Sequence, residues 1–401
     1  MRHRVKADME QGLLDIGPDN SLFICLECLG DPMLKEFKSL PTSEVTCAAC
    51  RCSTRRAVCP LRIASFIRRH LPTHFSIDDG LYDGYEMTLS EIVGKAIRCD
   101  YKPVCDAIAL ELSDPDSDED DFYWHGQVYC HQHSPFDDEE HERWWVVGDW
   151  ERVAYELTYE RRFFNERASK LFEALLHEAL TAKNPECLEA PAVIKILPTG
   201  TELYRARIAS DIDEARHFKS NPSIELSAPP PGFAKNNRMS AVGIPWMYLA
   251  RDIPTCVSEV LPKPGNIVVA GKFTSTVPLS IFDFNTLSGL LKHEDLSLFS
   301  PDHEERSNHQ KLLRYLHDEI ARRVERTDTG YVVTQAFAEF IRFYAPHSFD
   351  GISFRSVQNP GGINVVLFAK DEPDCYRSPG RYPQFDLTIS CESVTTHFIE
   401  D

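Results

Sequence analysis

Hydrophobic and polar positions follow a helical period in some segments of this chain and a strand-like period in others. The clearest helix is predicted over residues 161–182, because Phe164, Ala168, Leu171, Leu175 and Leu180 recur on one face with charged residues opposite. Leucines and other apolar residues at helical spacing predict a second helix over 303–325. Shorter mixed patterns over 61–71, 89–98 and 104–112 favour short helices in the N-terminal half.

After residue 197 short β-like runs dominate. They are TELYRARI (201–208), WMYLA (246–250), NIVVAGKFT (266–274), YVVTQAFAEFIRF (331–343), GISFRS (351–356) and INVVLF (363–368). An aromatic stretch, FYWHGQVYCHQH at 122–133, is also rich in residues that favour strands. Strands interrupted by the helix at 303–325 predict an α+β protein whose C-terminal domain is a mixed α/β fold.

Length and composition narrow the class of protein. With 401 residues, 42% hydrophobic and 26% charged, we expect a soluble globular chain of two or three units. No stretch reaches the apolar length of a membrane span, and the N-terminus has no apolar core of an export signal, so we expect a cytoplasmic protein without membrane attachment. A net charge of −19 argues against nonspecific binding to nucleic acid, although a local basic cleft can still hold an anion.

Thirteen cysteines in a chain with no export signal favour metal ligands and buried thiols over disulfides. Cys25 and Cys28 form one C-x2-C pair, and Cys47 and Cys50 form another. This spacing predicts a structural zinc site, because four thiolates fill a tetrahedral shell and leave no catalytic position. Reduced, unligated thiols are the alternative.

Other candidate ligands lie near these pairs and elsewhere in the N-terminal half. Cys52 or Cys59 could replace one thiolate of the zinc site, and Cys130 with His131 and His133 could add ligands, although a solvated loop is the simpler interpretation of that second group. The acidic runs at 114–121 and 137–142 lack the regular spacing of a calcium loop, and we interpret them as solvated loops.

Five segments of the C-terminal half stand in a characteristic order: LYRAR at 203–207, NRMSAVGIPWMYLA at 237–250, SEV at 258–260, VVTQ at 332–335, and GISFRS followed by NVVLF through residue 368. This order resembles the RES family, named for arginine, glutamate and serine. The resemblance implies an ADP-ribosyltransferase-like core that consumes NAD⁺. Many members carry Gly-Arg-Trp-Asn where this chain has Asn237-Arg238-Met239-Ser240.

The resemblance implies the site residues, and their chemistry agrees with it. Arg205, Glu259 and Ser356 would be catalytic, while Arg205, Arg238, Tyr248, Ser356 and Asn364 would contact NAD⁺. A carboxylate can stabilise the cationic sugar formed when the nicotinamide–ribose bond breaks, and guanidinium groups bind pyrophosphate in forked geometry.

Each candidate residue also has a purely structural interpretation. Arg205 and Glu259 could form an ion pair, Tyr248 could pack in the core, and Arg238 could be a solvated loop residue. Ser356 could belong to a turn, and Asn364 could satisfy backbone groups at a strand edge.

The resemblance implies a toxin or defence enzyme that depletes NAD⁺ by hydrolysis or phosphorolysis. An antitoxin partner or the N-terminal half would restrain it, and a homo-oligomer is an open expectation. The alternatives are an ADP-ribosyltransferase acting on a macromolecule and a non-catalytic nucleotide-binding protein. The N-terminal half resembles HEPN/RES N-terminal regions, but Arg62 and His70 lack the spacing of a HEPN ribonuclease motif.

The predicted organisation has four parts. Residues 1–60 form a zinc-binding module, and 61–190 form a mixed, mainly helical region with acidic loops. Residues 191–375 form the RES domain, and 376–401 form a C-terminal tail.

Overall fold

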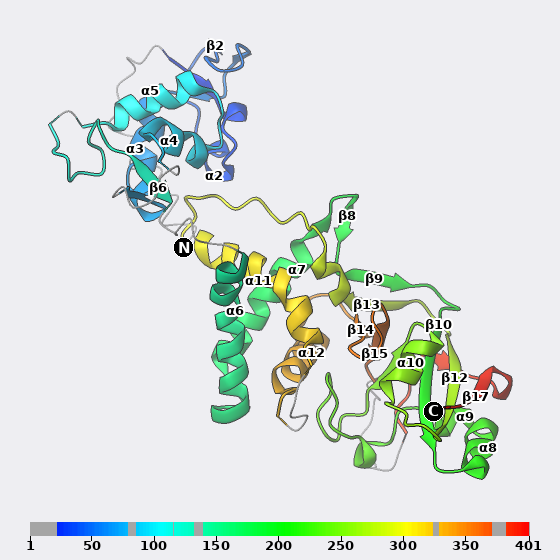
Figure 1. Ribbon diagram of the computed structural model, residues 1–401. Helices are drawn as coiled ribbons and strands as arrows, with labels where there is room; N and C mark the ends of the chain where they lie inside the picture. Colours follow the sequence, from blue (N-terminus) through cyan, green and yellow to red (C-terminus); the bar gives the residue numbers. More distant parts are fainter. Residues whose placement is uncertain are drawn as a thin grey trace. The chain divides into compact units, whose positions relative to one another are not determined.

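The computed structural model describes residues 22–78, 86–114, 116–131, 139–323, 329–370 and 382–400. The chain divides into two compact units (Figure 1). The first contains residues 1–142 and 295–307, and the second contains 143–294 and 308–401. The combination of helices with a mixed sheet confirms the α+β class, and the four-part organisation stays a prediction. No helix in the described ranges is both long enough and apolar enough to span a bilayer.

The first unit packs short strands and helices around a small core. Helices α3 (Pro60–Ile67), α4 (Leu89–Ile97) and α5 (Lys102–Leu112) confirm the predicted short helices, and their inward residues include Ile63, Ile92 and Ile108, all fully buried. The other elements are β1 (Ile24–Cys25), η1 (Leu26–Cys28), α2 (Pro32–Lys35), β2 (Val45–Thr46), β3 (Ser53–Thr54), β4 (Ala57–Val58), η2 (Leu71–Thr73), β5 (Phe75–Ile77) and β6 (Tyr129–His131). These strands pair only two at a time.

A buried carboxylate ties the distant segment 295–307 into the first unit. Asp31 caps α2 by accepting the backbone N–H of Met33 at 2.9 Å, and it is fully buried. The same carboxylate accepts the Ser297 hydroxyl at 2.8 Å and the Leu298 N–H at 3.0 Å. Phe299 adds an apolar side chain to the core beside Phe66. This segment is therefore held by both hydrogen bonds and packing.

The second unit is built on a nine-stranded sheet. Its strands are β9 (Ile194–Leu197), β10 (Glu202–Ala209), β11 (Met247–Ala250), β12 (Ile267–Ser275), β13 (Leu279–Asp283), β14 (Gly351–Arg355), β15 (Ile363–Leu367), β16 (Leu387–Thr388) and β17 (Val394–Phe398). The order is β16-β12-β10-β11-β15-β14-β13-β9, with β17 also on β12. Neighbouring strands are antiparallel except β13 and β14.

Strand alternation gives this sheet two apolar faces. On β15, Val366 belongs to the core shared with α6 (Glu139–Tyr155), α7 (Glu166–Thr181), α11 (His303–Ala321) and α12 (Val332–Tyr344). Val365 and Leu367 belong to the opposite core, shared with α8 (Ile212–Ser220). Shorter elements complete the unit: η3 (a π-helix, Glu156–Glu160), β7 (Lys183–Asn184), β8 (Cys187–Pro191), α9 (Pro222–Glu225), η4 (Pro231–Phe233), α10 (Ile253–Glu259), η5 (Phe284–Ser288) and η6 (Cys391–Ser393).

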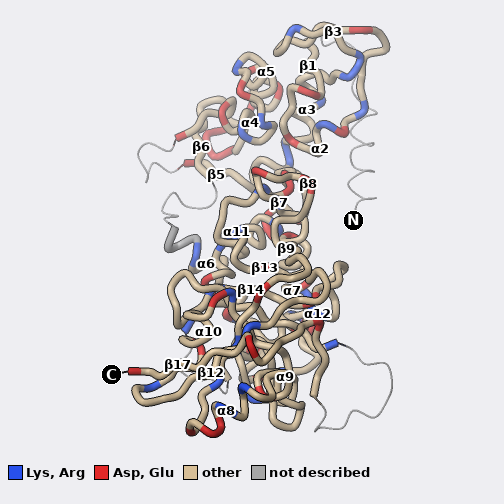
Figure 2. Tube along the Cα trace, turned by 90° about the vertical axis from the view of Figure 1, so that its right-hand side faces the viewer, with Lys and Arg blue, Asp and Glu red and all other residues tan. Residues whose placement is uncertain are grey.

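Lysine and arginine are interspersed with aspartate and glutamate along the described trace (Figure 2). Exposed pairs such as Arg216–Asp213, 2.7 Å apart, are typical of a solvated surface and contribute little to stability.

Two sequence predictions are wrong. Residues 331–343 were expected to form a strand, but 332–343 lie in helix α12, where Val333, Phe337 and Ile341 are buried at helical spacing. Their β-branched and aromatic composition is overridden by packing in the core. The predicted helix over 161–182 begins only at Glu166, because Asn165 caps it, and Phe164 is 97% exposed with a left-handed φ of 55°.

Candidate functional site

Glu259 ends helix α10 and presents its carboxylate near two buried polar side chains. Its Oε1 accepts the Ser356 hydroxyl at 2.6 Å and the Asn364 amide at 2.7 Å. Ser356 is only 4% exposed and Asn364 only 7%, whereas Glu259 is exposed. A carboxylate at a helix C-terminus faces the negative end of the helix dipole, so helix stability does not account for this glutamate.

A tight turn between β14 and β15 brings Ser356 to Glu259. The Ser356 Oγ also accepts the N–H groups of Gln358 at 3.2 Å and Asn359 at 3.0 Å, which fixes the hydroxyl so that its proton points to the carboxylate. Gly361 has a φ of 83°, which favours glycine. A side chain at Gly362 would collide with Thr255 of α10, so the turn and the helix approach closely.

Helix α10 is itself held at its N-terminus. Asp252 accepts the Thr255 N–H at 2.7 Å and the Thr255 hydroxyl at 2.9 Å. The Asn359 amide donates to the same Thr255 Oγ1 at 2.8 Å. The start of α10 and the turn that carries Ser356 are therefore linked, which limits the freedom of Glu259 at the other end of this short helix.

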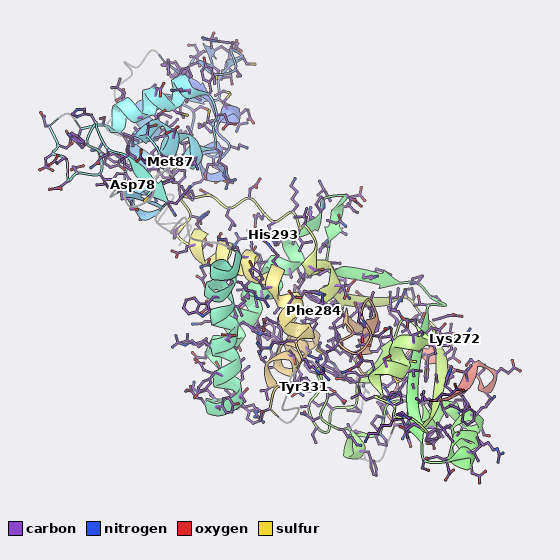
Figure 3. The ribbon with its side chains drawn as sticks, in the orientation of Figure 1. Asp78, Met87, Lys272, Phe284, His293 and Tyr331 are labelled. Atoms are coloured by element: carbon purple, nitrogen blue, oxygen red, sulfur yellow. The ribbon has the colours of Figure 1, made fainter. Side chains whose placement is uncertain are left out.

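Arg238 lies in a loop before β11 and binds the end of helix α11. Its Nη1 donates to the carbonyls of Ile320 at 2.9 Å and Arg322 at 2.8 Å. The guanidinium also lies 5.0 Å from the centre of the ring of Tyr331, which directly precedes α12 and is labelled in Figure 3. Cations at a helix C-terminus are stabilised by its free carbonyls, so this arginine has a defined position rather than a solvated one.

The electrostatics place Arg238 in the field of Glu259. Burial lowers the pKa of the Arg238 guanidinium, and Tyr331, Glu259 and Tyr248 oppose that shift. The negative charge of Glu259 therefore acts on Arg238 through space, although the two side chains form no ion pair within the described part of the chain.

Tyr248 on β11 directs its phenol toward the Arg238 loop. The phenolic oxygen accepts the Met239 N–H at 3.0 Å and lies 3.1 Å from the Ser240 Oγ. Burial raises the pKa of Tyr248 to about 12, so the phenol stays protonated at neutral pH. Its side chain packs against the larger core, while its hydroxyl holds the loop.

Arg205 has a different neighbourhood. Its Nη1 donates to the Tyr248 carbonyl at 2.7 Å, and its buried Nε has no hydrogen-bond partner in the part of the chain that the structure describes. Burial lowers the pKa of Arg205 to about 10, with Arg207 adding to the shift and Tyr248 opposing it. Arg205 lies opposite Gly271 in the β10–β12 ladder, where an added side chain would meet Leu226 of the α8 core. Among the described ion pairs, none joins Arg205 to Glu259.

The structure thus brings Glu259, Ser356 and Asn364 together and joins Arg238 to Tyr248 through one loop. Sequence reasoning gave no role to Thr334 and Gln335, whose side chains bind this loop from α12. Both residues belong to the VVTQ segment at 332–335, one of the five ordered motifs. The segment was predicted to be a strand, whereas it forms the first turn of α12.

The four predicted metal ligands form a cluster in the first unit. The Sγ atoms of Cys25, Cys28, Cys47 and Cys50 lie within 4.8 Å of one another, with 3.6 Å between Cys25 and Cys50 and 3.9 Å between Cys28 and Cys47. Tetrahedral zinc with Zn–S bonds of about 2.3 Å requires sulfurs about 3.8 Å apart. The cluster could therefore bind a metal ion, and its donor set and spacing fit zinc.

The alternative ligands do not join this cluster. Cys59 is the buried residue before α3, and the Cys52 thiol lies 3.8 Å from the Cys50 carbonyl. Cys130 lies 3.2 Å from the Ser76 hydroxyl, and the His131 ring packs 5.0 Å from Phe75. His133 lies outside the described residues.

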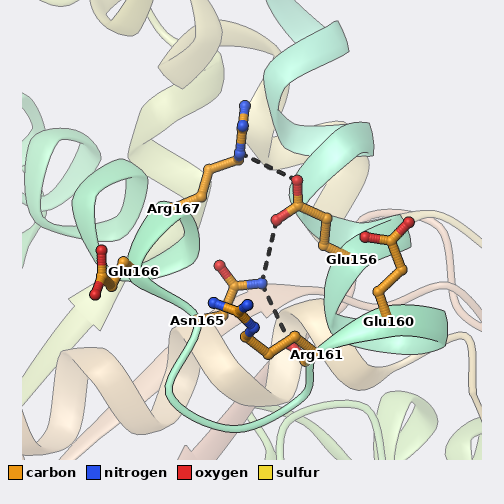
Figure 4. A pocket seen from close by; sticks show the side chains of 6 residues that line it. All are labelled: Glu156, Glu160, Arg161, Asn165, Glu166 and Arg167. Carbon is orange, nitrogen blue, oxygen red and sulfur yellow. Dashed lines mark hydrogen bonds and ion pairs between the residues drawn. The ribbon is translucent and has the colours of Figure 1, made fainter.

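A separate pocket of about 400 Å³ lies where α6 leads through η3 to α7 (Figure 4). It is lined by Glu156, Glu160, Arg161, Asn165, Glu166 and Arg167. Glu156 is satisfied there by Arg167 at 3.1 Å and by the Asn165 amide at 3.3 Å. This pocket contains none of the predicted site residues.

The comparison with protein-family models agrees with the motif order. A comparison with curated proteins found no match. The predicted HEPN/RES-type character of the N-terminal region stays a prediction. Residues 202–390, which contain Glu259, Ser356, Asn364 and the Arg238 loop, match the family model described as RES domain. The chain therefore carries a RES domain, a type of domain generally associated with NAD-related enzymatic activity.

Proposed function

We propose that the RES domain binds NAD⁺ and cleaves its nicotinamide–ribose bond. The observation that carries this proposal is the exposed Glu259 carboxylate, whose Oε1 is held by Ser356 and Asn364. Its Oε2 accepts no hydrogen bond from the described residues, so one oxygen is free to face a ligand. A fixed carboxylate with one free oxygen suits the stabilisation of positive charge that develops on a sugar.

The reaction follows from this arrangement. As the bond between the ribose C1′ and the nicotinamide nitrogen breaks, its electron pair goes to the nitrogen and neutralises the pyridinium. Positive charge grows on the ribose ring, and Glu259 stabilises it. An oxygen of water or inorganic phosphate then bonds to C1′. With water as acceptor, the products are ADP-ribose, nicotinamide and one proton released to solvent.

Arg238 is the residue that we assign to the pyrophosphate. Its Nη1 donates to the carbonyls of Ile320 and Arg322, which orients the guanidinium, and no acceptor among the described residues binds its Nε or Nη2. A forked pair of N–H groups matches phosphate oxygens better than a lysine ammonium does. Arg205 is a second candidate, because no acceptor among the described residues bonds to its buried Nε. The Tyr248 carbonyl accepts from Arg205, and the Tyr248 phenol binds the loop that carries Arg238.

Loss of NAD⁺ would make the protein a toxin or defence effector, and an antitoxin or the first unit would have to restrain it. The four-cysteine cluster holds zinc in this proposal and serves only to fold the first unit, since four thiolates leave no open coordination position.

The test compares wild type with Glu259→Gln in full-length, metal-loaded protein. NAD⁺ loss and nicotinamide release are followed with and without phosphate. We expect kcat to fall about 100- to 1,000-fold in the variant, as for loss of one preorganised electrostatic group. Glu392→Gln is the matched control, because Glu392 is exposed and no described hydrogen bond or ion pair joins its side chain to a predicted site residue.

The possible results separate the alternatives. Phosphate-dependent release identifies phosphorolysis, and phosphate-independent release identifies hydrolysis. ADP-ribose attached to a protein or nucleic acid would favour a transferase instead. A Glu259→Gln variant as active as wild type would remove the proposed role of this carboxylate.

A further inference from the structure

We propose that Gln335 is the positioning residue of the Arg238 loop, which it holds in the shape that presents the arginine to the pyrophosphate of NAD⁺. This inference rests on the proposed function. It assigns a role to a side chain that lies on a different element from every predicted site residue, in the first turn of helix α12.

The Gln335 amide is surrounded by acceptors from one loop. Its Nε2 lies 2.9 Å from the Asn236 Oδ1, 2.6 Å from the Asn237 carbonyl and 3.2 Å from the Ser240 carbonyl. These acceptors flank Arg238 on both sides in the chain. The two protons of the Gln335 amide are shared among these three oxygens, so one side chain bonds to the loop on both sides of Arg238.

Neighbouring groups complete the same loop. The Thr334 hydroxyl donates to the Arg238 carbonyl at 2.6 Å, and the Asn237 N–H donates to the Ser240 carbonyl at 3.0 Å. The Tyr248 phenol binds the Met239 N–H from the side of β11. The loop backbone is therefore fixed from a helix and from a strand, whereas the Arg238 guanidinium is fixed by α11.

The chemistry requires an amide at position 335. Gln335 is 7% exposed, so an unpaired polar group there would cost the desolvation of a buried donor or acceptor. A carboxylate would place an acceptor against acceptors, and an apolar side chain would take away the donor to the Asn237 carbonyl. Position 335 thus selects a side chain with an N–H donor of this length.

This arrangement predicts a specific kinetic signature. A pyrophosphate contact is made equally in the bound substrate and in the transition state, so weakening it raises KM and leaves kcat nearly unchanged. Glu259 acts on charge that exists only in the transition state, so its loss lowers kcat. If Gln335 were purely structural, its replacement would instead lower the thermal midpoint without raising KM separately from kcat.

The experiment uses the full-length, metal-loaded protein with Gln335→Met, which keeps the volume and removes the donor. We expect KM for NAD⁺ to rise about ten-fold with kcat within two-fold of wild type, and Gln335→Glu to raise KM further. Thr334→Val is a milder second variant and should shift KM in the same direction by about three-fold. Gln310→Met is the control, because Gln310 is also a helical glutamine and donates to Glu178 at 2.9 Å.

Hydrogen exchange of residues 236–240 is measured on the same proteins without NAD⁺. Faster exchange in Gln335→Met but not in Gln310→Met supports the positioning role. An unchanged KM, a loss confined to kcat, or unchanged exchange of the loop would overturn it. If wild type neither binds nor cleaves NAD⁺, the proposed function fails, and the exchange experiment still decides whether Gln335 positions the loop.

Discussion

Different interactions stabilise each of the two units of this protein internally. In the first unit the strands are two or three residues long and pair in twos. The thiol cluster links Cys25 of β1 to the segment after β2, and the buried Asp31 carboxylate links α2 to Ser297. In the second unit nine strands form one sheet with apolar cores on both faces. We therefore expect the first unit, whose apolar core is smaller, to depend more on a few polar or metal links, whereas the large sheet is stabilised by burial spread over many residues.

The difference also explains where the candidate site lies. A reactive carboxylate needs neighbours whose positions are fixed to within a fraction of an ångström. The second unit supplies them from regular elements, since Asn364 lies in β15, Ser356 directly follows β14, and Gln335 lies on the buried face of α12. The first unit offers a cluster suited to a structural metal.

Metal removal is the change with the largest expected effect. Chelation, or Cys47→Ser, should unfold the first unit, because apparent binding energies of structural zinc are about 10 kcal/mol or more. Hydrogen exchange of α3, α4 and α5 measures this, with the sheet of the second unit as internal reference. Cys187→Ser is the control, because Cys187 is exposed and lies outside the cluster. Full protection of these helices after verified metal loss would contradict the comparison.

Asp31→Ala should have an intermediate effect on the first unit. The change removes the cap of α2 and leaves the buried Ser297 hydroxyl and Leu298 N–H without their acceptor, at a cost of about 3 kcal/mol. Urea unfolding followed by a first-unit probe measures it. Asp100→Ala, at an exposed position, is the matched control and should change little. Equal stability of the two variants would show that segment 295–307 is held by packing alone.

The smallest expected effect is a pH dependence of the first unit. Burial, with Arg69 and His74 adding to the shift, lowers the pKa of His70 to about 4, from an ordinary value near 6.5. Between about pH 6.5 and pH 4 the imidazole of His70 is protonated in the unfolded chain but neutral in the folded state. The free energy of unfolding is therefore highest above about pH 6.5 and falls as the pH drops toward 4. His70→Phe should lose less stability than wild type between pH 7 and pH 5. Urea midpoints of the metal-loaded proteins at both pH values measure this, and identical pH dependence would contradict it.

Much of the site could be predicted from the sequence because its chemistry is encoded in local segments. The order of the motifs pointed to Glu259, Ser356 and Asn364, and the structure places them within hydrogen-bond distance. The C-x2-C pairs predicted the thiol cluster in the same way. The distinction between Arg205 and Arg238 could not be predicted, because it depends on the face of β10 and on the end of α11.

The sequence by itself determined the α+β class, the helices of the first unit, the four-thiol cluster and the residue types of the candidate site. These properties depend on periodicity, spacing and side-chain chemistry, all of which are local. Only the tertiary structure decided that 332–343 is helical, that Gln335 bonds to the Arg238 loop and that Asp31 binds Ser297. The physical reason is that a buried polar group takes the partner that folding brings near, and these partners lie about 100 to 270 residues away in the chain.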